Sequence, residues 1–236
     1  MSDNKVKEIF RSKQGDGFDQ GYNATTYMEF YQPGDRFSEI FYDAASQLSS
    51  LHRYLEYSRR YIWRYLKEGA ACEKQLFDDG AAAEEEILYD ETFGADKKYL
   101  LRYNDESVFL MTYTLLESFV HRLVEEQERE QHLDFKSRNY QGPMIARYTA
   151  FLKESCHMNI VFEDALWERF QRIRKIRNVF IHSSGVVSQN AFRRALEREH
   201  PELLEGNRLV LNYDFLIGVF ETIGEMLRAV EKAYWE

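Results

Sequence analysis

Hydrophobic residues recur every three or four positions along most of the chain, which is the period of an amphipathic α-helix. From residue 35 to Gly69 this spacing continues over a length that suits one long helix or two in line. Further helical stretches follow at residues 70–79, 81–94, 104–130, 143–157, 162–182, 188–199 and 214–235. Pro occurs only three times, so few positions must interrupt a helix. The pattern predicts an all-α protein.

Two boundaries divide this pattern into three parts. Residues 1–34 are polar and rich in glycine, which predicts a flexible or irregular N-terminal arm. Asn104 and Asp105 are of the residue types that cap helix N-termini, so we expect a new helix to begin there. We therefore expect this arm, an N-terminal helical elaboration over 35–103, and an antiparallel helical bundle over 104–236.

Composition and charge limit the classes of function. The net charge of −9 argues against non-specific coating of nucleic acid, although it allows a local basic site. Cys72 and Cys156 are far apart in the sequence, which argues against a disulfide scaffold or a structural zinc site. The N-terminus has no signal-peptide core, and no run of residues is apolar enough to span a bilayer. We expect a soluble cytoplasmic protein with no membrane segment, metal or cofactor.

The helix predicted over 162–182 combines an apolar stripe with basic residues. Its core-facing positions fall on one side of a helical wheel: Leu166, Phe170, Ile173, Ile176 and Phe180. Arg177 lies within this stripe, and Arg174, Asn178 and His182 follow one flank at intervals of four residues. Because an unpaired buried guanidinium is costly, Arg177 needs a carboxylate or a wet cleft that binds a phosphate.

Glu117 is a matching anion on the helix predicted over 104–130. It interrupts the apolar sequence TLLESFV, so it too lies next to core positions. Two interpretations follow. Glu117 and Arg177 form a structural salt bridge, or they line a polar cleft together with Arg174, Asn178 and His182.

Basic residues are concentrated in the same part of the chain. Between Arg169 and Leu196 there is no Asp or Glu, although the chain contains 40 of them. The span holds seven cations: Arg169, Arg172, Arg174, Lys175, Arg177, Arg193 and Arg194. An acid-free patch on an acidic protein favours a local docking site for a polyanion.

The sequence RNVFIH at residues 177–182 resembles the R-x4-6-H signature of HEPN domains, with the polar Asn178 directly after the Arg. The SSG turn at 183–185 is similar to the small, polar, glycine-ended turn that follows this signature in many members. A helix containing LLESF and a helix beginning P-x-x-x-R-Y precede it, as in HEPN bundles. The similarity covers about residue 104 to the C-terminus.

This resemblance implies a metal-independent endoribonuclease that needs no cofactor and acts as a homodimer. Arg177 would bind the scissile phosphate of RNA, and His182 would handle protons during attack by the 2′-hydroxyl. Asn178 would orient a phosphate oxygen or the His, and Arg172, Arg174, Lys175 and Glu117 would support RNA binding. Toxin, phage-defence or stress roles are implied, with an antitoxin or another regulatory protein as a partner. Some HEPN toxins are modified at a Tyr two residues after the His, where this chain has Ser184.

Other interpretations remain open. In one alternative, the chain has lost catalysis and acts as a HEPN-like interaction or RNA-binding module. A di-metal site would use two Glu-x-x-His pairs, Glu154/His157 and Glu197/His200, although both stand at predicted helix ends. The tyrosines at 54, 57, 61 and 65 are expected to pack in the core or in an interface, with base stacking as the alternative.

Overall fold

The computed structural model describes residues 30–36, 38–79, 83–137, 139–188 and 190–236, so most of the predicted arm lies outside the described residues. The long helices are α2 (Glu39–Asp79), α3 (Ala83–Gln131), α5 (Asp164–Ser183) and α7 (Tyr213–Trp235). Shorter helical elements are η2 (Phe135–Ser137), α4 (Met144–Glu154), α6 (Ala191–Glu199) and η3 (Pro201–Leu203). A small antiparallel ribbon joins β1 (Leu204–Glu205) to β2 (Arg208–Leu209). The predicted all-α class is confirmed.

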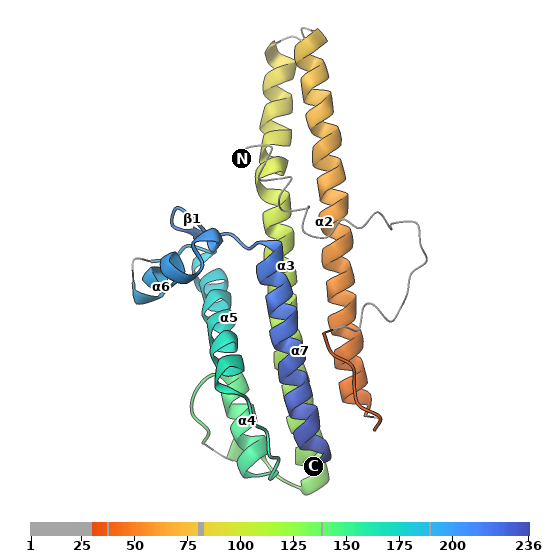
Figure 1. Ribbon diagram of the computed structural model, residues 1–236, viewed down its shortest axis with the longest axis vertical. Coiled ribbons are helices and arrows are strands. Elements are labelled where there is room, and N and C mark those ends of the chain that lie inside the picture. Colours follow the sequence, from red (N-terminus) through yellow and green to blue (C-terminus); the bar gives the residue numbers. More distant parts are fainter. Residues whose placement is uncertain (1–29, 37, 80–82, 138, 189) are drawn as a thin grey trace.

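Helices α2 and α3 form a long antiparallel hairpin whose upper half extends beyond the other described helices (Figure 1). The predicted helix start at Asn104 is wrong, because α3 runs through this position without a break. Asn104 and Asp105 are both buried, and Asp105 accepts a hydrogen bond from Arg59 of α2. The carboxylate therefore joins two helices and does not cap one.

Gly69 was expected to end the first long helix, but α2 continues to Asp79. A β-carbon added at Gly69 would lie 2.1 Å from the ring of Phe93 on α3. Phe93 is almost fully buried. Because Gly69 has no side chain, the Phe93 ring fits against its backbone and the two helices of the hairpin can approach each other closely.

Helix α3 is the central element, since it packs against α2, α4, α5 and α7. The apolar spacing expected over 104–130 forms one buried stripe of this helix, made of Phe109, Thr112, Leu116, Phe119, Val120 and Leu123. Figure 1 shows α7 running alongside α3, with α4 and α5 forming a second layer next to this pair. The bundle therefore buries the core-facing sides of α3, α5 and α7 together. Among the described helices, none has an uncharged apolar stretch long enough to cross a membrane.

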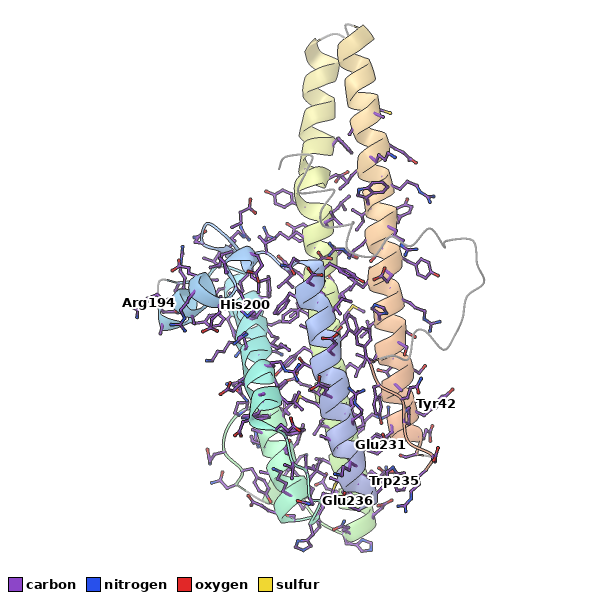
Figure 2. All side chains as sticks on the ribbon, in the orientation of Figure 1. Tyr42, Arg194, His200, Glu231, Trp235 and Glu236 are labelled. Atoms are coloured by element: carbon purple, nitrogen blue, oxygen red, sulfur yellow. The ribbon has the colours of Figure 1, made fainter. Side chains whose placement is uncertain are left out.

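The segment from Phe30 to Arg36 lies along the C-terminal half of α7 and is anchored by Glu231. The two carboxylate oxygens of Glu231 accept hydrogen bonds from the Tyr31 hydroxyl at 2.9 Å and from the Gly34 amide at 2.7 Å. Figure 2 labels Glu231 and Trp235 near the end of α7, close to the beginning of α2. This part of the predicted arm is irregular, as expected, but it is tied to the bundle.

The tyrosines of α2 do not pack in the core. Tyr61 is 73% exposed and Tyr54 is 50% exposed, and Tyr57 and Tyr65 are also largely accessible. The expectation of packing in the core of this chain is therefore wrong for these four residues, and packing in an interface stays a prediction. They point outward because α2 uses the opposite side, including Leu48 and Leu55, to contact its neighbours.

Candidate functional site

Helix α5 places the candidate signature at its C-terminal end. Its buried side chains are the five that the wheel predicted: Leu166, Phe170, Ile173, Ile176 and Phe180. The helix ends where Ser184 adopts a left-handed conformation with φ of 48° and Gly185 follows with φ of 82°. The Ser184 amide donates to the Val179 carbonyl, as is usual at such a helix end. The predicted stop at residues 183–185 is confirmed.

Arg177 and Glu117 meet between α5 and α3. The nearest guanidinium and carboxylate atoms are 3.6 Å apart, and the two side chains are 27% and 25% exposed. The Arg177 guanidinium also lies over the Tyr113 ring, 5.3 Å from its centroid, and donates to Asn178 Oδ1 at 3.4 Å. Burial raises the pKa of the Glu117 carboxyl, and Arg177 partly opposes this shift. The predicted pairing of Glu117 with Arg177 is confirmed, although the contact is long and partly exposed.

The remaining predicted site residues are not gathered around Arg177. His182 is exposed in the last turn of α5, and its side chain has no hydrogen bond or ion pair with another described residue. Arg174 donates to Gln171 Oε1 on the same helix at 2.9 Å. Lys175 is exposed and lies about 160° around the helix from Arg177. The structure therefore brings Glu117, Arg177 and Asn178 together and leaves His182 apart.

In the folded protein, carboxylates from outside the acid-free span neutralise several of its cations. Carboxylates from outside the span reach four of its cations: Glu225 pairs with Arg169, Glu199 with Arg172, Glu117 with Arg177, and Glu197 with Arg193. Glu117 and Glu225 come from α3 and α7, so a window along the sequence cannot reveal them, whereas Glu197 and Glu199 stand just past the end of the span. The inference of a bare cationic patch on α5 is therefore only partly correct.

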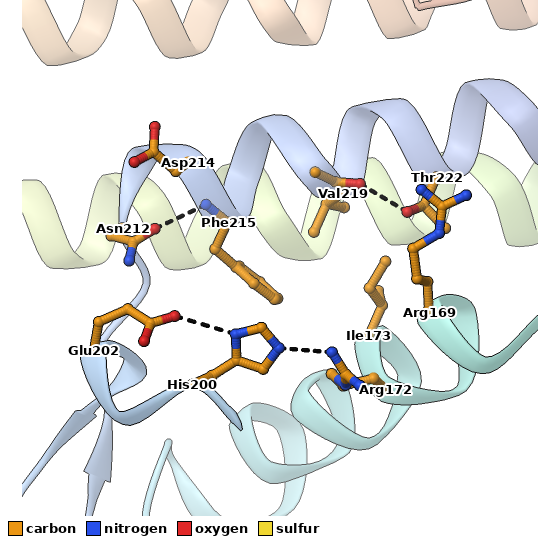
Figure 3. A pocket seen from close by; sticks show the side chains of 11 residues that line it. Arg169, Arg172, Ile173, His200, Glu202, Asn212, Asp214, Phe215, Val219 and Thr222 are labelled. Carbon is orange, nitrogen blue, oxygen red and sulfur yellow. Dashed lines mark hydrogen bonds and ion pairs between the residues drawn. The ribbon is translucent and has the colours of Figure 1, made fainter. Parts of the chain in front are cut away.

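A cavity of about 470 Å³ lies between α5, η3 and α7, on a different side of α5 from Arg177. Figure 3 shows that polar side chains surround an apolar floor. The lining consists of Arg169, Arg172, Ile173, His200, Glu202, Asn212, Asp214, Phe215, Gly218, Val219 and Thr222. Of these, Arg172 was a predicted site residue and His200 was named only as a di-metal candidate, because the lining comes from three separate stretches of the chain.

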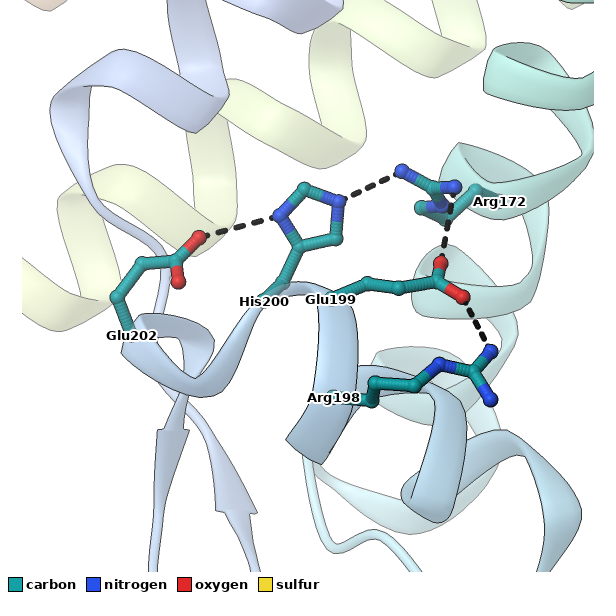
Figure 4. Close-up of polar contacts among 5 residues, drawn as sticks. All are labelled: Arg172, Arg198, Glu199, His200 and Glu202. Carbon is teal, nitrogen blue, oxygen red and sulfur yellow. Dashed lines mark hydrogen bonds and ion pairs between the residues drawn. The ribbon is translucent and has the colours of Figure 1, made fainter.

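His200 lies at the edge of this cavity between a cation and a carboxylate (Figure 4). Its Nε2 is 2.6 Å from Arg172 Nη1, and its Nδ1 is 3.1 Å from Glu202 Oε1. An arginine can only donate, so this geometry assigns Nε2 as the acceptor and places the proton on Nδ1, where it is donated to Glu202. Arg172 also donates to Glu199 at 3.1 Å. The two contacts fix the orientation of the imidazole ring at the edge of the cavity.

The residues proposed for a di-metal site have other partners. Glu197 pairs with Arg193, and His200 contacts Arg172 and Glu202. Glu154 ends α4, and His157 follows it with a positive φ of 58°. Within the described part of the chain, no group of three or more His, Cys, Asp or Glu side chains is arranged to hold a metal ion.

Comparison of the chain with protein-family models, with curated proteins and with solved structures found no match.

Proposed function

We propose that this chain is a metal-independent endoribonuclease of the HEPN type, in which Arg177 binds the scissile phosphate of RNA and His182 transfers protons. The observation that carries the proposal is the environment of the Arg177 guanidinium. Its guanidinium is held at the surface between α3 and α5 by one long carboxylate contact, so a phosphate can compete for it. His182 follows on the same helix with its imidazole exposed.

The chemistry needs these two residue types. The 2′-hydroxyl of RNA attacks phosphorus, the 5′-oxygen leaves, and the products carry a 2′,3′-cyclic phosphate and a 5′-hydroxyl. A guanidinium stabilises the extra negative charge of the transition state through paired hydrogen bonds. A histidine, which titrates near neutral pH, can accept the proton of the attacking hydroxyl or supply one to the leaving oxygen.

A homodimer is part of the proposal, because one protomer does not aim both groups at one atom. Arg177 and His182 are five residues apart, which places them about 140° apart around the helix. A second copy across a two-fold axis would combine the cation of one protomer with the imidazole of the other. Ile181 is 51% exposed between Asn178 and His182 and supplies an apolar contact for such an interface.

The test is cleavage of single-stranded and structured RNA in EDTA by the purified full chain. Arg177→Ala and His182→Ala should each lose cleavage while circular dichroism stays unchanged. Lys153→Ala is the matched control, because Lys153 is an exposed cation in the last turn of α4 and is not one of the predicted site residues. Cleavage that survives both site variants rules out this site, and loss in His200→Ala alone relocates the chemistry to the cavity. Light scattering tests the dimer.

A second candidate function is a non-catalytic RNA-binding or interaction module. The pairing of Arg177 with Glu117 favours it, because the same contact serves a purely structural role. This candidate predicts that the wild-type chain binds RNA without cleaving it under any of the conditions above.

A further inference from the structure

The outer face of α2 between Arg53 and Lys67 repeats one dipeptide. Arg-Tyr occurs at residues 53–54, 60–61 and 64–65. The intervals of seven and four residues correspond to about two turns and one turn of an α-helix, so the three pairs return to the same side. The cations and the rings therefore form two neighbouring stripes along α2.

The ring stripe is accessible over its whole length. Its members are exposed by 50%, 42%, 73% and 38% at Tyr54, Tyr57, Tyr61 and Tyr65. On the helical wheel they fall within an arc of about 80°, and they extend about 16 Å along the helix axis. The Tyr65 hydroxyl donates to Asp96 of α3 at 2.6 Å, which fixes the ring at the upper end of the stripe.

This face lacks the aliphatic residues of a helix-packing seam. The aliphatic side chains of the stretch, Leu55, Ile62 and Leu66, all project from the opposite side of the helix. Leu55 is fully buried against the bundle. Between residues 53 and 67 the outward positions are tyrosines, arginines and a lysine. A helix packed against this face would therefore contact aromatic rings and charges instead of an apolar groove.

Charge along this stretch is strongly positive in a chain of net charge −9. Four cations lie on the outward side: Arg53, Arg60, Arg64 and Lys67. Glu56 is the one carboxylate between residues 53 and 67, and it accepts a hydrogen bond from Tyr213 of α7 and lies 3.9 Å from Arg60. Glu68 follows directly and is exposed on the side of the tyrosines, so cations outnumber carboxylates on this face without excluding them. Unlike Arg169, Arg172 and Arg177 of α5, Arg64 and Lys67 have no carboxylate partner within the described residues.

We propose that this Arg-Tyr face of α2 is a docking surface for single-stranded RNA. Single-stranded nucleic acids bind where aromatic rings stack on successive bases and cations follow the phosphates, and this face has both stripes side by side. The binding does not require the cleavage chemistry. The choice of RNA over DNA as the occupant rests on the proposed function.

The test is fluorescence anisotropy with the purified full chain and a labelled 2′-O-methyl oligouridine, which the proposed nuclease cannot cleave. Tyr61→Ala should weaken binding about 5- to 150-fold, since stacking on one ring contributes about 1–3 kcal/mol. Tyr61→Phe keeps the ring and should bind like the wild type. Tyr42→Ala is the matched control, because Tyr42 is 52% exposed on the same helix but lies outside the Arg-Tyr stretch.

A second variant tests the cations. Arg64→Gln should lower the slope of log affinity against log salt concentration by about 0.7, as expected for one phosphate contact in a single strand. Unchanged affinity in Tyr61→Ala, or an equal loss in Tyr42→Ala, overturns the proposal. Competition by poly-glutamate as strong as by oligouridine also overturns it, because the face would then recognise any polyanion. An oligothymidine that binds tenfold more tightly than the RNA overturns the choice of RNA.

The docking-surface proposal and the nuclease proposal can fail independently of each other. Tyr61→Ala should weaken binding of the 2′-O-methyl oligouridine by the same factor in the wild-type chain and in an Arg177→Ala background, because the docking surface and the proposed cleavage site lie on different helices. Tyrosine-dependent binding without any RNA cleavage supports the docking surface and contradicts the nuclease. Cleavage by a chain whose RNA affinity does not depend on Tyr61 contradicts the docking surface alone.

Discussion

Arg59 of α2 and Asp105 of α3 form an ion pair across the helical hairpin, and their side chains are only 6% and 5% exposed. Removing both charges from water costs more than their attraction returns unless the geometry is favourable. The pKa of the Asp105 carboxyl reflects both effects, because burial raises it to about 6 and the attraction of Arg59 opposes this rise only in part. The pair therefore fixes how α2 meets α3 and contributes little net stability.

The first prediction is a pH dependence that follows from this shift. A carboxyl whose pKa is higher in the folded state than in the unfolded chain binds more protons when folded, so its stabilising contribution is present at low pH. The rise from 3.8 to about 6 corresponds to about 3 kcal/mol, which is lost as pH increases from 4 to 7. We expect this difference between the wild type and Arg59→Met/Asp105→Leu in urea unfolding at several pH values. Parallel pH profiles would contradict the shift.

A second prediction concerns the same pair at a single pH. Arg59→Met leaves a buried carboxylate without its partner and should reduce the free energy of unfolding by about 3–5 kcal/mol at pH 7. Arg59→Met/Asp105→Leu removes both charges and should recover most of this loss. Chemical denaturation of both variants measures the difference. A double variant as unstable as the single one would mean that the pair is itself strongly stabilising.

Two glycines of α7 form a matched pair for a third prediction. A β-carbon at Gly218 meets nothing within 4 Å, whereas one at Gly224 would lie 2.0 Å from the Phe30 carbonyl oxygen. Gly218→Ala should stabilise the protein by about 0.5–1 kcal/mol, because alanine favours the helix. Gly224→Ala should destabilise it by about 1–3 kcal/mol, because the segment held by Glu231 must move.

Urea unfolding of the two alanine variants gives the measurement, and each variant is the control for the other. Limited proteolysis provides a second readout, since only Gly224→Ala should expose the chain around residues 30–36 to cleavage. Equal effects of the two substitutions would show that the close approach of Phe30 to α7 is not a constraint.

The fourth prediction separates the structural and functional roles of Glu117. A partly exposed ion pair with a long contact contributes no more than about 1 kcal/mol, so Glu117→Gln should leave the free energy of unfolding almost unchanged. The same substitution frees the Arg177 guanidinium from its carboxylate and should strengthen binding of RNA, measured by anisotropy in EDTA. Arg177→Ala in the Glu117→Gln background should abolish the gain. A large loss of stability in Glu117→Gln would assign the pair to the core.

Periodicity predicted the apolar stripes of α3 and α5 because each depends only on the spacing of residues within one helix. The stripe containing Phe170 and Ile173 is buried where the wheel placed it. The pairing of Glu117 with Arg177 was also predictable, since each charge interrupts an apolar stripe and needs a partner.

The errors have a common physical origin in contacts between distant segments. Asp105 looked like a helix cap because its partner Arg59 is 46 residues away. The span around Arg169 looked uncompensated because Glu225 is 56 residues away. The cavity at His200 depends on three helical elements meeting, and a single amphipathic pattern carries no signal for it.

The hairpin of α2 and α3 also has a consequence for how the molecule opens. Its upper half extends past α5 and α7, so among the described elements the two helices there protect mainly each other (Figure 1). Backbone amides in such a region exchange with solvent through local opening, at a lower free energy than those of the bundle. Hydrogen exchange should therefore divide the chain into two cooperative units, with the boundary near the buried pair of Arg59 and Asp105. The contacts between α2 and α3 in the upper half join segments that are close in the sequence, so no long loop must close before they form. The hairpin is therefore expected to form early in folding.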